Sequence, residues 1–228
     1  MNVQALRRDA AYSGWIRTLL ARALATLQRL LGMQVFRVNL RPIRGHPAEP
    51  RPPDGITLRL MRLEELVEAA ADPEFEFEPA FARAALAQGD LVFGAYDGDR
   101  LISLTWRTPT AAPLAESIWV RIGPRCHHAY KTFVKASHRG RRIHTAVSCF
   151  ADRYSVERGC PAEIGLINIA NLASIGAAQA LGRKKVGYAG YVSVFGHCIP
   201  FRTAGVRDIG VELFKPHETA IDLVPAQG

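Results

Sequence analysis

The segment that decides the fold runs from Tyr130 to Thr145 and reads Tyr-Lys-Thr-Phe-Val-Lys-Ala-Ser-His-Arg-Gly-Arg-Arg-Ile-His-Thr. Its first six residues alternate between two faces, which predicts a strand. The chain then breaks at Ser137-His138-Arg139-Gly140, and a helix is expected from about Ile143 to Arg158. The order is therefore strand, basic turn and helix N-terminus.

The basic turn is a candidate anion site. The amides of a helix's first turn have no partner within the helix, and the helix dipole favours negative charge there. Arg139, Arg141 and Arg142 add guanidinium groups, whose geometry suits phosphate. We interpret the segment as a pyrophosphate cradle, and the alternative is a solvated basic turn.

The composition is that of a globular chain. With 228 residues, 48% of them hydrophobic and 22% charged, the chain can bury one full core. We find no apolar run long enough for a membrane span and no secretory signal. The four cysteines lack Cys-x-x-Cys spacing, which indicates reduced thiols inside the cell. Cys126-His127-His128 is not expected to hold a metal, because consecutive strand residues point to opposite faces.

The net charge of +8 is concentrated in an N-terminal arm. Residues 1–44 contain eight arginines and one acidic residue, Asp9, so the rest of the chain is close to neutral. The high isoelectric point therefore describes the arm alone, and nucleic acid is not predicted as a partner.

Residues 13–31 are predicted to form a basic amphipathic helix. Their apolar side chains fall on one broad arc, Arg17, Arg22 and Arg29 lie on the other side, and Gly32 is placed to end the helix. Such a helix can pack on its own domain, pair with its copy in a homodimer, or lie on an anionic membrane surface. The pattern leaves these three alternatives open.

The remaining pattern predicts an α+β fold that borders on a three-layer α/β arrangement, with a mixed sheet. A proline-rich connector, Pro42–Gly55, separates the arm from the body. Asp97-Gly98 predicts a hairpin, and 108–114 is expected to be a loop. Other strands are expected at 34–41, 56–61, 91–96, 101–106, 117–122, 162–167, 185–195, 199–203 and 209–214, and other helices at 63–71, 79–88 and 171–181.

An acidic stretch precedes the helix expected at 79–88. Glu74, Glu76 and Glu78 alternate along it. They either attract a cationic amine substrate or serve as helix N-terminal charges and solvated loop.

Two motifs resemble those of the GNAT superfamily of N-acetyltransferases, over roughly residues 56–203. Val134 followed by Arg139-Gly-Arg-Arg-Ile-His144 resembles the family's acyl-CoA motif, in which a valine precedes Arg-Gly-x-Gly-Ile-Gly. Asn171-Leu-Ala-Ser174, followed by Leu181-Gly182, resembles its second motif. The two motifs stand in register, and together they are more specific than either one alone.

The chain departs from the family pattern at four positions. Arg142 and His144 stand where small residues usually let the pyrophosphate approach the amides. Arg142 therefore either replaces an amide contact or blocks the site. Arg183 replaces a common aromatic, and Ala178 replaces the tyrosine that many members use as general acid. The resemblance is therefore to a divergent member, whose general acid is absent or supplied elsewhere.

The resemblance implies a mostly antiparallel mixed sheet with helices on both faces. It implies an arm over 1–55, an acyltransferase domain over 56–215 and a tail over 216–228. Acetyl-CoA or another acyl-CoA would be the donor, an amine of a small molecule or an amino sugar the acceptor, and no metal is implied. The implied cofactor-binding residues are Phe133, Val134, Arg139, Gly140, Arg141, Arg142, Ile143, His144, Thr145, Asn171 and Ser174.

Acyl transfer to an amine needs a base, an oxyanion donor and a proton donor. His128 is the preferred base, because it shares a strand face with Tyr130 and Val134, and a structural histidine is its alternative. Glu163 is the second candidate base, and an exposed carboxylate at the start of a strand is its alternative. Tyr130 and Tyr188 are candidate proton donors, and an amide near Val134 is the candidate oxyanion donor.

The predicted function is acyl-CoA-dependent N-acyl transfer, in its simplest form N-acetyl transfer. One alternative is a catalytically silent acyl-CoA-binding module. Another is a membrane-peripheral acyltransferase that uses a long-chain acyl-CoA or an acyl carrier protein. The predicted location is the cytoplasm, with the inner face of the membrane as the alternative.

Overall fold

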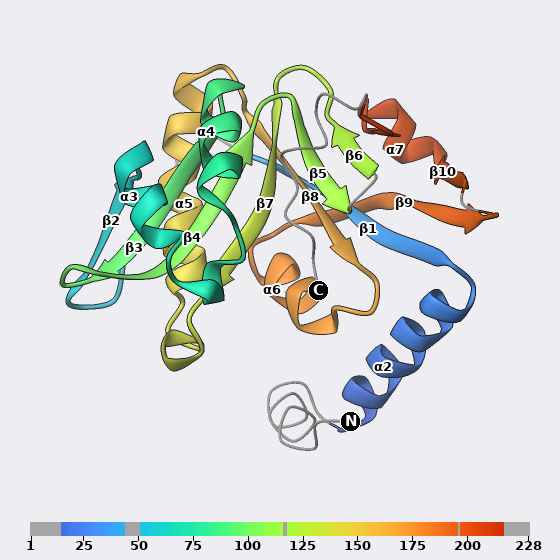
Figure 1. Cartoon of the computed structure of the whole chain (residues 1–228), viewed down its shortest axis with the longest axis horizontal. Coiled ribbons are helices and arrows are strands. Elements are labelled where there is room, and N and C mark those ends of the chain that lie inside the picture. Colours follow the sequence, from blue (N-terminus) through green and yellow to red (C-terminus); the bar gives the residue numbers. More distant parts are fainter. Residues whose placement is uncertain (1–14, 44–50, 116–117, 196, 217–228) are drawn as a thin grey trace. The chain divides into compact units, whose positions relative to one another are not determined.

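The computed structural model describes residues 15–43, 51–115, 118–195 and 197–216 (Figure 1). These residues form two compact units. Unit 1 contains the described residues of Met1–Arg41 and Gly165–Ile209, and unit 2 contains those of Pro42–Ile164 and Gly210–Gly228. Strand β8 (Ala162–Asn168) runs through the division, with its first three residues in unit 2. The predicted boundaries at 55 and 215 stay a prediction.

Unit 2 is built on antiparallel strands. Its main sheet has the order β7, β4, β3, β2, with bounds Cys126–Val134, Arg100–Thr108, Leu91–Asp97 and Ile56–Leu60. A three-stranded sheet has the order β11, β6, β5, with bounds Glu212–Phe214, Ile118–Arg121 and Ala111–Ala115.

Helices cover both faces of the main sheet of unit 2 (Figure 1). On one face, α5 (Ile143–Glu157) packs Ile143, Val147 and Ala151 against Phe93 and Ile102. On the other face, α4 (Pro79–Ala87) places Phe81 with its ring centroid 5.1 Å from that of Trp106. The helix α3 (Leu63–Ala69) and the short η1 (Pro73–Phe75) precede α4. Phe81 also contacts Tyr130 on β7, the strand that enters the basic turn, with ring centroids 6.5 Å apart.

Unit 1 contains a second set of antiparallel strands, β10 (His197–Arg202), β9 (Lys184–Val194) and β1 (Met33–Pro42), in that order. Its helices are α2 (Trp15–Leu30), α6 (Leu172–Ala180) and α7 (Ala204–Asp208). A Cβ atom at Gly190 would lie 2.1 Å from the carbonyl oxygen of Gln34. The pairing of β9 with β1 therefore requires glycine at this position.

The α+β fold class, the mostly antiparallel sheet and the helices on both faces are confirmed. Among the described residues, one strand and one α-helix were not predicted. The expected loop at 108–114 contains β5, an edge strand that tolerates Pro113. Helix α7 has five residues, too few to show a period in sequence. The predicted tail lies outside the described residues except for Pro216, and residues 44–50 of the connector also lie outside them.

No helix in the described part of the chain is long and apolar enough to cross a membrane.

Candidate functional site

The basic turn between β7 and α5 has the geometry of an anion site. Gly140 and Arg142 both adopt left-handed backbone conformations, with φ of 81° and 60°. Positive φ at these two residues reverses the chain direction between β7 and α5. The N-cap residue of α5, Arg142, makes no side-chain cap hydrogen bond, and the first turn of the helix contains no acidic residue. The predicted strand, turn and helix N-terminus are confirmed as structure, and the first-turn amides remain suited to an external anion.

The three arginines of the turn differ in the contacts of their side chains. The Nε atom of Arg139 donates to the carbonyl oxygen of Val134 at 3.1 Å, so this guanidinium turns back along its own strand. Arg141 and Arg142 are exposed, whereas Ile143 is buried in the core of unit 2. Arg142 is therefore not buried in the turn, and the phosphate-binding roles of Arg141 and Arg142 stay predictions.

The main chain at the end of β7 turns successive amides to opposite edges of the strand. The amide of Lys135 donates to Ile102 on β4 at 2.8 Å, and Ser103 Oγ donates to the carbonyl of Phe133 at 2.7 Å. Because successive residues of a strand point their amides to opposite edges, the amide of Val134 faces away from β4. Of the two predicted main-chain partners of pantetheine, only Val134 faces this edge, which also suits its predicted role as oxyanion donor.

A buried lysine anchors the end of β7. Lys135 Nζ bonds Asp72 and lies 3.4 Å from the carboxylate of Glu74. The hydrogen bond from Lys135 lowers the pKa of Asp72 below its usual value. Lys131 Nζ donates to the main-chain carbonyl oxygen of Glu76 at 3.0 Å. Glu74 therefore helps to hold the strand, which supports the structural alternative for the acidic stretch. The sequence did not indicate Lys135, because its partners lie about sixty residues upstream.

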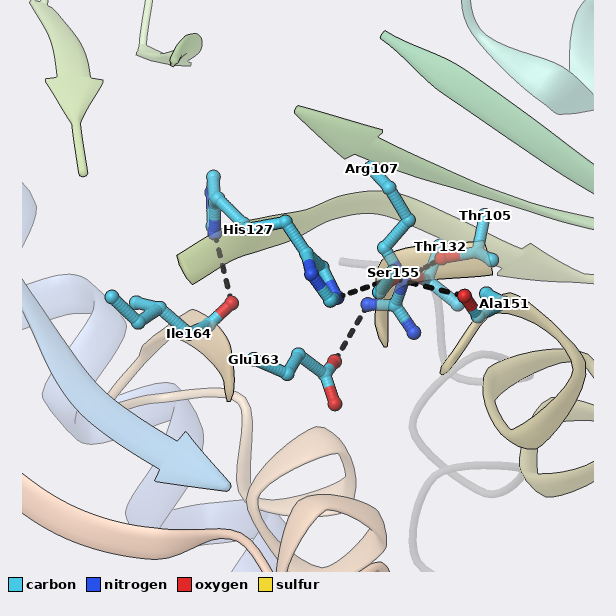
Figure 2. A network of polar contacts seen from close by, with 9 residues as sticks. Thr105, Arg107, His127, Thr132, Ala151, Ser155, Glu163 and Ile164 are labelled. Carbon is cyan, nitrogen blue, oxygen red and sulfur yellow. Dashed lines mark hydrogen bonds and ion pairs between the residues drawn. The ribbon is translucent and has the colours of Figure 1, made fainter. Parts of the chain in front are cut away.

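His128 lies inside unit 2, with 2% of its surface exposed. Its Nδ1 is 3.2 Å from the carbonyl oxygen of Ile164, and its ring stacks on Tyr130 with centroids 5.8 Å apart. A carbonyl only accepts, so Nδ1 carries the proton and Nε2 is the basic nitrogen in the neutral ring. The neighbouring His127 points elsewhere, with Nε2 3.2 Å from Ser155 Oγ on α5 (Figure 2).

Glu163 forms a buried ion pair with Arg107, a residue that sequence reasoning missed (Figure 2). Its exposed fraction is 0%, and Arg107 Nη1 donates to Glu163 Oε1 at 2.6 Å. The expected alternative, an exposed carboxylate at the start of the strand, is therefore wrong. The pair joins β4 to β8 across 56 residues of sequence, and the only local signal is a charged residue at the end of an apolar strand.

Tyr130 is buried and donates its hydroxyl to Asp90. Burial raises the pKa of Tyr130 well above 10. Burial also raises the pKa of Asp90 from 3.8 to about 6, although hydrogen bonds from Tyr130, Thr108 and Gln88 act in the opposite direction. A phenol with so high a pKa is a weak acid, which weighs against Tyr130 as the proton donor. Asp90 was missed because it follows Gly89 and reads as a loop residue.

The second motif lies in unit 1. Asn171 caps α6, since its Oδ1 accepts from the amide of Ser174 at 3.0 Å. Ala178, where many GNAT members have tyrosine, is buried on α6. Tyr188 lies partly exposed on β9. The predicted helix is confirmed, while the binding roles of Asn171 and Ser174 stay predictions.

No group of three or more His, Cys, Asp or Glu side chains suited to a metal ion occurs among the described residues.

No protein-family model and no curated protein sequence matches the chain. Solved structures do match it, among them a GCN5-related N-acetyltransferase from Kribbella flavida, with 15% identity, a TM-score of 0.44, and 71% of this chain and 60% of that chain covered. Another, from Sphaerobacter thermophilus, has 14% identity, a TM-score of 0.48, and covers 72% of this chain and 53% of that one.

A further similar structure is that of AAC(6')-Iy in complex with the bisubstrate analogue CoA-S-monomethyl-acetylneamine. It has 18% identity and a TM-score of 0.46, and the match covers 57% of this chain and 91% of that one. The chain spans less than two thirds of the length of the two GNAT structures from Kribbella flavida and Sphaerobacter thermophilus. All three structures have identities below 20% and TM-scores below 0.5.

Proposed function

We propose that the chain is an acyl-CoA-dependent N-acyltransferase. It transfers an acyl group, in the simplest case acetyl, from a CoA thioester to the amine of a small molecule or amino sugar. The observation that carries the proposal is the uncapped N-terminus of α5, which follows two left-handed residues and two exposed arginines. This combination binds phosphate groups through main-chain amides, the helix dipole and guanidinium forks.

In this proposal the turn holds the pyrophosphate of the donor. The amides from Arg139 to Thr145 and the guanidinium groups of Arg141 and Arg142 make the contacts. The outward-facing main chain of Val134 aligns the pantetheine, and Asn171 and Ser174 complete the predicted binding set. An amide donor near the thioester carbonyl stabilises the negative charge that develops on its oxygen.

His128 is the proposed general base and Glu163 the second candidate. Because Nδ1 carries its proton toward the Ile164 carbonyl, Nε2 is the nitrogen that would take up the proton of the amine, directly or through water. Glu163 is held by Arg107, so a catalytic role would require this ion pair to open. With Tyr130 bound to Asp90, Tyr188 is the better remaining candidate for protonating the thiolate.

A catalytically silent acyl-CoA-binding module is the second candidate function. One specific observation favours it: His128, Glu163 and Tyr130 are all buried, and each is already bonded within unit 2. A membrane-peripheral enzyme that uses a long-chain acyl-CoA or an acyl carrier protein is the third, and it rests on the basic N-terminal helix. The proposed location is the cytoplasm, with the inner face of the membrane as the alternative. The chain would work there as a monomer or as a homodimer. The four cysteines form no disulfide bond with one another.

Two measurements on the full chain test the proposal. Acetyl-CoA and CoA should raise the melting temperature, because a ligand that binds only the folded state stabilises it. Incubation of acetyl-CoA with a panel of amines and amino sugars should then release free CoA, measured by chromatography because the free cysteines would react with a thiol reagent. Stabilisation without CoA release would favour the silent module, and the absence of any shift at millimolar ligand would exclude both.

A further inference from the structure

The side of α2 that packs on unit 1 is polar. Thr18 and Gln28 are its buried residues, each with 4% of its surface exposed. Gln28 Oε1 accepts from the amide of Val35 at 2.8 Å, and its Nε2 donates to Asn168 Oδ1 at 3.2 Å. Buried polar side chains are kept only where such partners satisfy them. Hydrogen bonds therefore hold the helix to unit 1 through its polar side.

The apolar side of α2 faces outward, which is the reverse of an ordinary surface helix. At 100° per residue its exposed apolar side chains span an arc of about 140° opposite Thr18 and Gln28. Leu30 is 80% exposed. We call this set the α2 stripe, and it consists of Trp15, Ile16, Leu19, Leu20, Leu27 and Leu30.

The tip of the β9–β10 hairpin, near the end of α2, is also apolar and exposed. The amide of Ser193 donates to the carbonyl of Gly32 at 2.6 Å, which sets the end of β9 beside the end of α2. The next two residues, Val194 and Phe195, are exposed, Phe195 to 97%. Large exposed apolar surfaces on one side of a protein indicate an interaction site.

We propose that the α2 stripe and the hairpin tip dock this protein on an anionic lipid membrane. An amphipathic helix lies in the membrane plane when its apolar arc is broad and basic residues border it. Here Arg29 is exposed, and both Arg22 and Arg29 lie at the same edge of the stripe. The proposal goes beyond the acyl-transfer activity and does not depend on it.

Charge and shape favour lipid over a second copy of the chain. The sequence of α2 contains no acidic residue, so a self-complementary pair of helices would bring arginine against arginine without a counter-charge. Anionic head groups supply that counter-charge. An arc of about 140° is also wider than the narrow seam of a two-helix coiled coil, and it suits partial immersion in an interface.

Co-sedimentation of the full chain with vesicles tests the proposal. The vesicles contain phosphatidylcholine alone or phosphatidylcholine with phosphatidylserine. The wild type should bind the anionic vesicles, and Leu19→Gln with Leu27→Gln should weaken binding by a factor on the order of ten. Ala25→Gln, on the exposed opposite side of the same helix, is the matched control and should bind like the wild type. Circular dichroism checks that each variant is folded.

Two further variants separate the charge from the hairpin. Arg29→Gln should weaken binding to anionic vesicles about fivefold and leave binding to neutral vesicles unchanged. Phe195→Asn should weaken binding to both; asparagine tolerates the φ of 49° at this position.

Three results would overturn the proposal. One is a wild type that stays in solution with every vesicle, and another is a double variant that binds as well as the wild type. The third is a wild-type dimer in sedimentation velocity that the double variant abolishes, with no vesicle binding, because a second copy would then cover the stripe. Thermal stabilisation by acetyl-CoA, measured on the same preparations, reports on the proposed activity separately.

Discussion

Replacing Asp90 with asparagine is expected to stabilise unit 2 at pH 8 but not at pH 4. Asp90 is 2% exposed and lies among Tyr130, Gln88 and Thr108. Burial is the largest influence on its pKa, which stands at about 6 instead of 3.8. The folded protein therefore keeps a proton that the unfolded chain releases between about pH 4 and pH 6. As the pH rises through this interval, the free energy of unfolding falls.

The size of the effect follows from the shift in pKa. A difference of about two units corresponds to about 3 kcal/mol at pH 8, where Asp90 is ionised in both states. Asparagine removes this cost. Its Oδ1 can still accept from Gln88 Nε2, and its Nδ2 can donate to the Tyr130 hydroxyl, which both donates and accepts. Allowing about 1 kcal/mol for imperfect hydrogen bonds, the net gain at pH 8 is about 2 kcal/mol.

Urea denaturation at pH 8 and at pH 4 measures this difference. Tryptophan fluorescence reports the transition, since the ring of Trp106 lies 6.0 Å from that of Tyr130. Asp99→Asn, at an exposed hairpin position, is the matched control and should change the free energy of unfolding by less than about 0.5 kcal/mol. If Asp90→Asn destabilised the protein equally at both pH values, the reasoning about burial would be refuted.

Three further changes test the packing. Glu163→Gln should lower the free energy of unfolding by about 3 kcal/mol or more, because Arg107 would stay buried without the charge of the Glu163 carboxylate. Wild-type stability in urea denaturation would contradict this. Gln28→Ala should reduce the free energy that holds α2 on unit 1 by about 1–2 kcal/mol, because both hydrogen bonds of Gln28 are lost. Hydrogen exchange should then become faster in α2 alone, and unchanged exchange would mean that Gln28 does not hold the helix. Gly190→Ala should lower the melting temperature, whereas Gly176→Ala, with open space around it, should not; equal melting temperatures would contradict the close strand approach.

The secondary structure was predictable where the signals are local. The alternation before Val134, the glycine and arginines after it, and the period of α5 all lie within one stretch of chain, so the basic turn followed from sequence. The start of α6 was equally predictable, because a helix cap such as Asn171 depends on residues three positions apart. Strand β5 was not predicted, because Pro113 argues against a central strand, whereas the edge position of β5 tolerates a proline.

The contacts of the candidate catalytic residues were not predictable, because they depend on pairing between distant strands. Glu163 meets Arg107, and Tyr130 meets Asp90, only when β4, β7 and β8 are assembled. The pattern of residues along a single sequence does not show which residues on distant strands will meet. The amphipathic pattern of α2 was found, but the pattern is the same whichever side packs on the protein. Only the hydrogen bonds of Gln28 show that the polar side does.

Calorimetric titration of CoA into the full chain tests the central claim most directly. The claim is that the N-terminus of α5 and its arginines hold the pyrophosphate, so CoA should bind and pantetheine, which lacks the phosphates, should bind far more weakly. Arg141→Gln should weaken CoA binding about five- to tenfold, whereas Arg153→Gln, exposed farther along α5, should leave it unchanged. Failure of CoA to bind, or equal affinity in the wild type and both variants, would contradict the account.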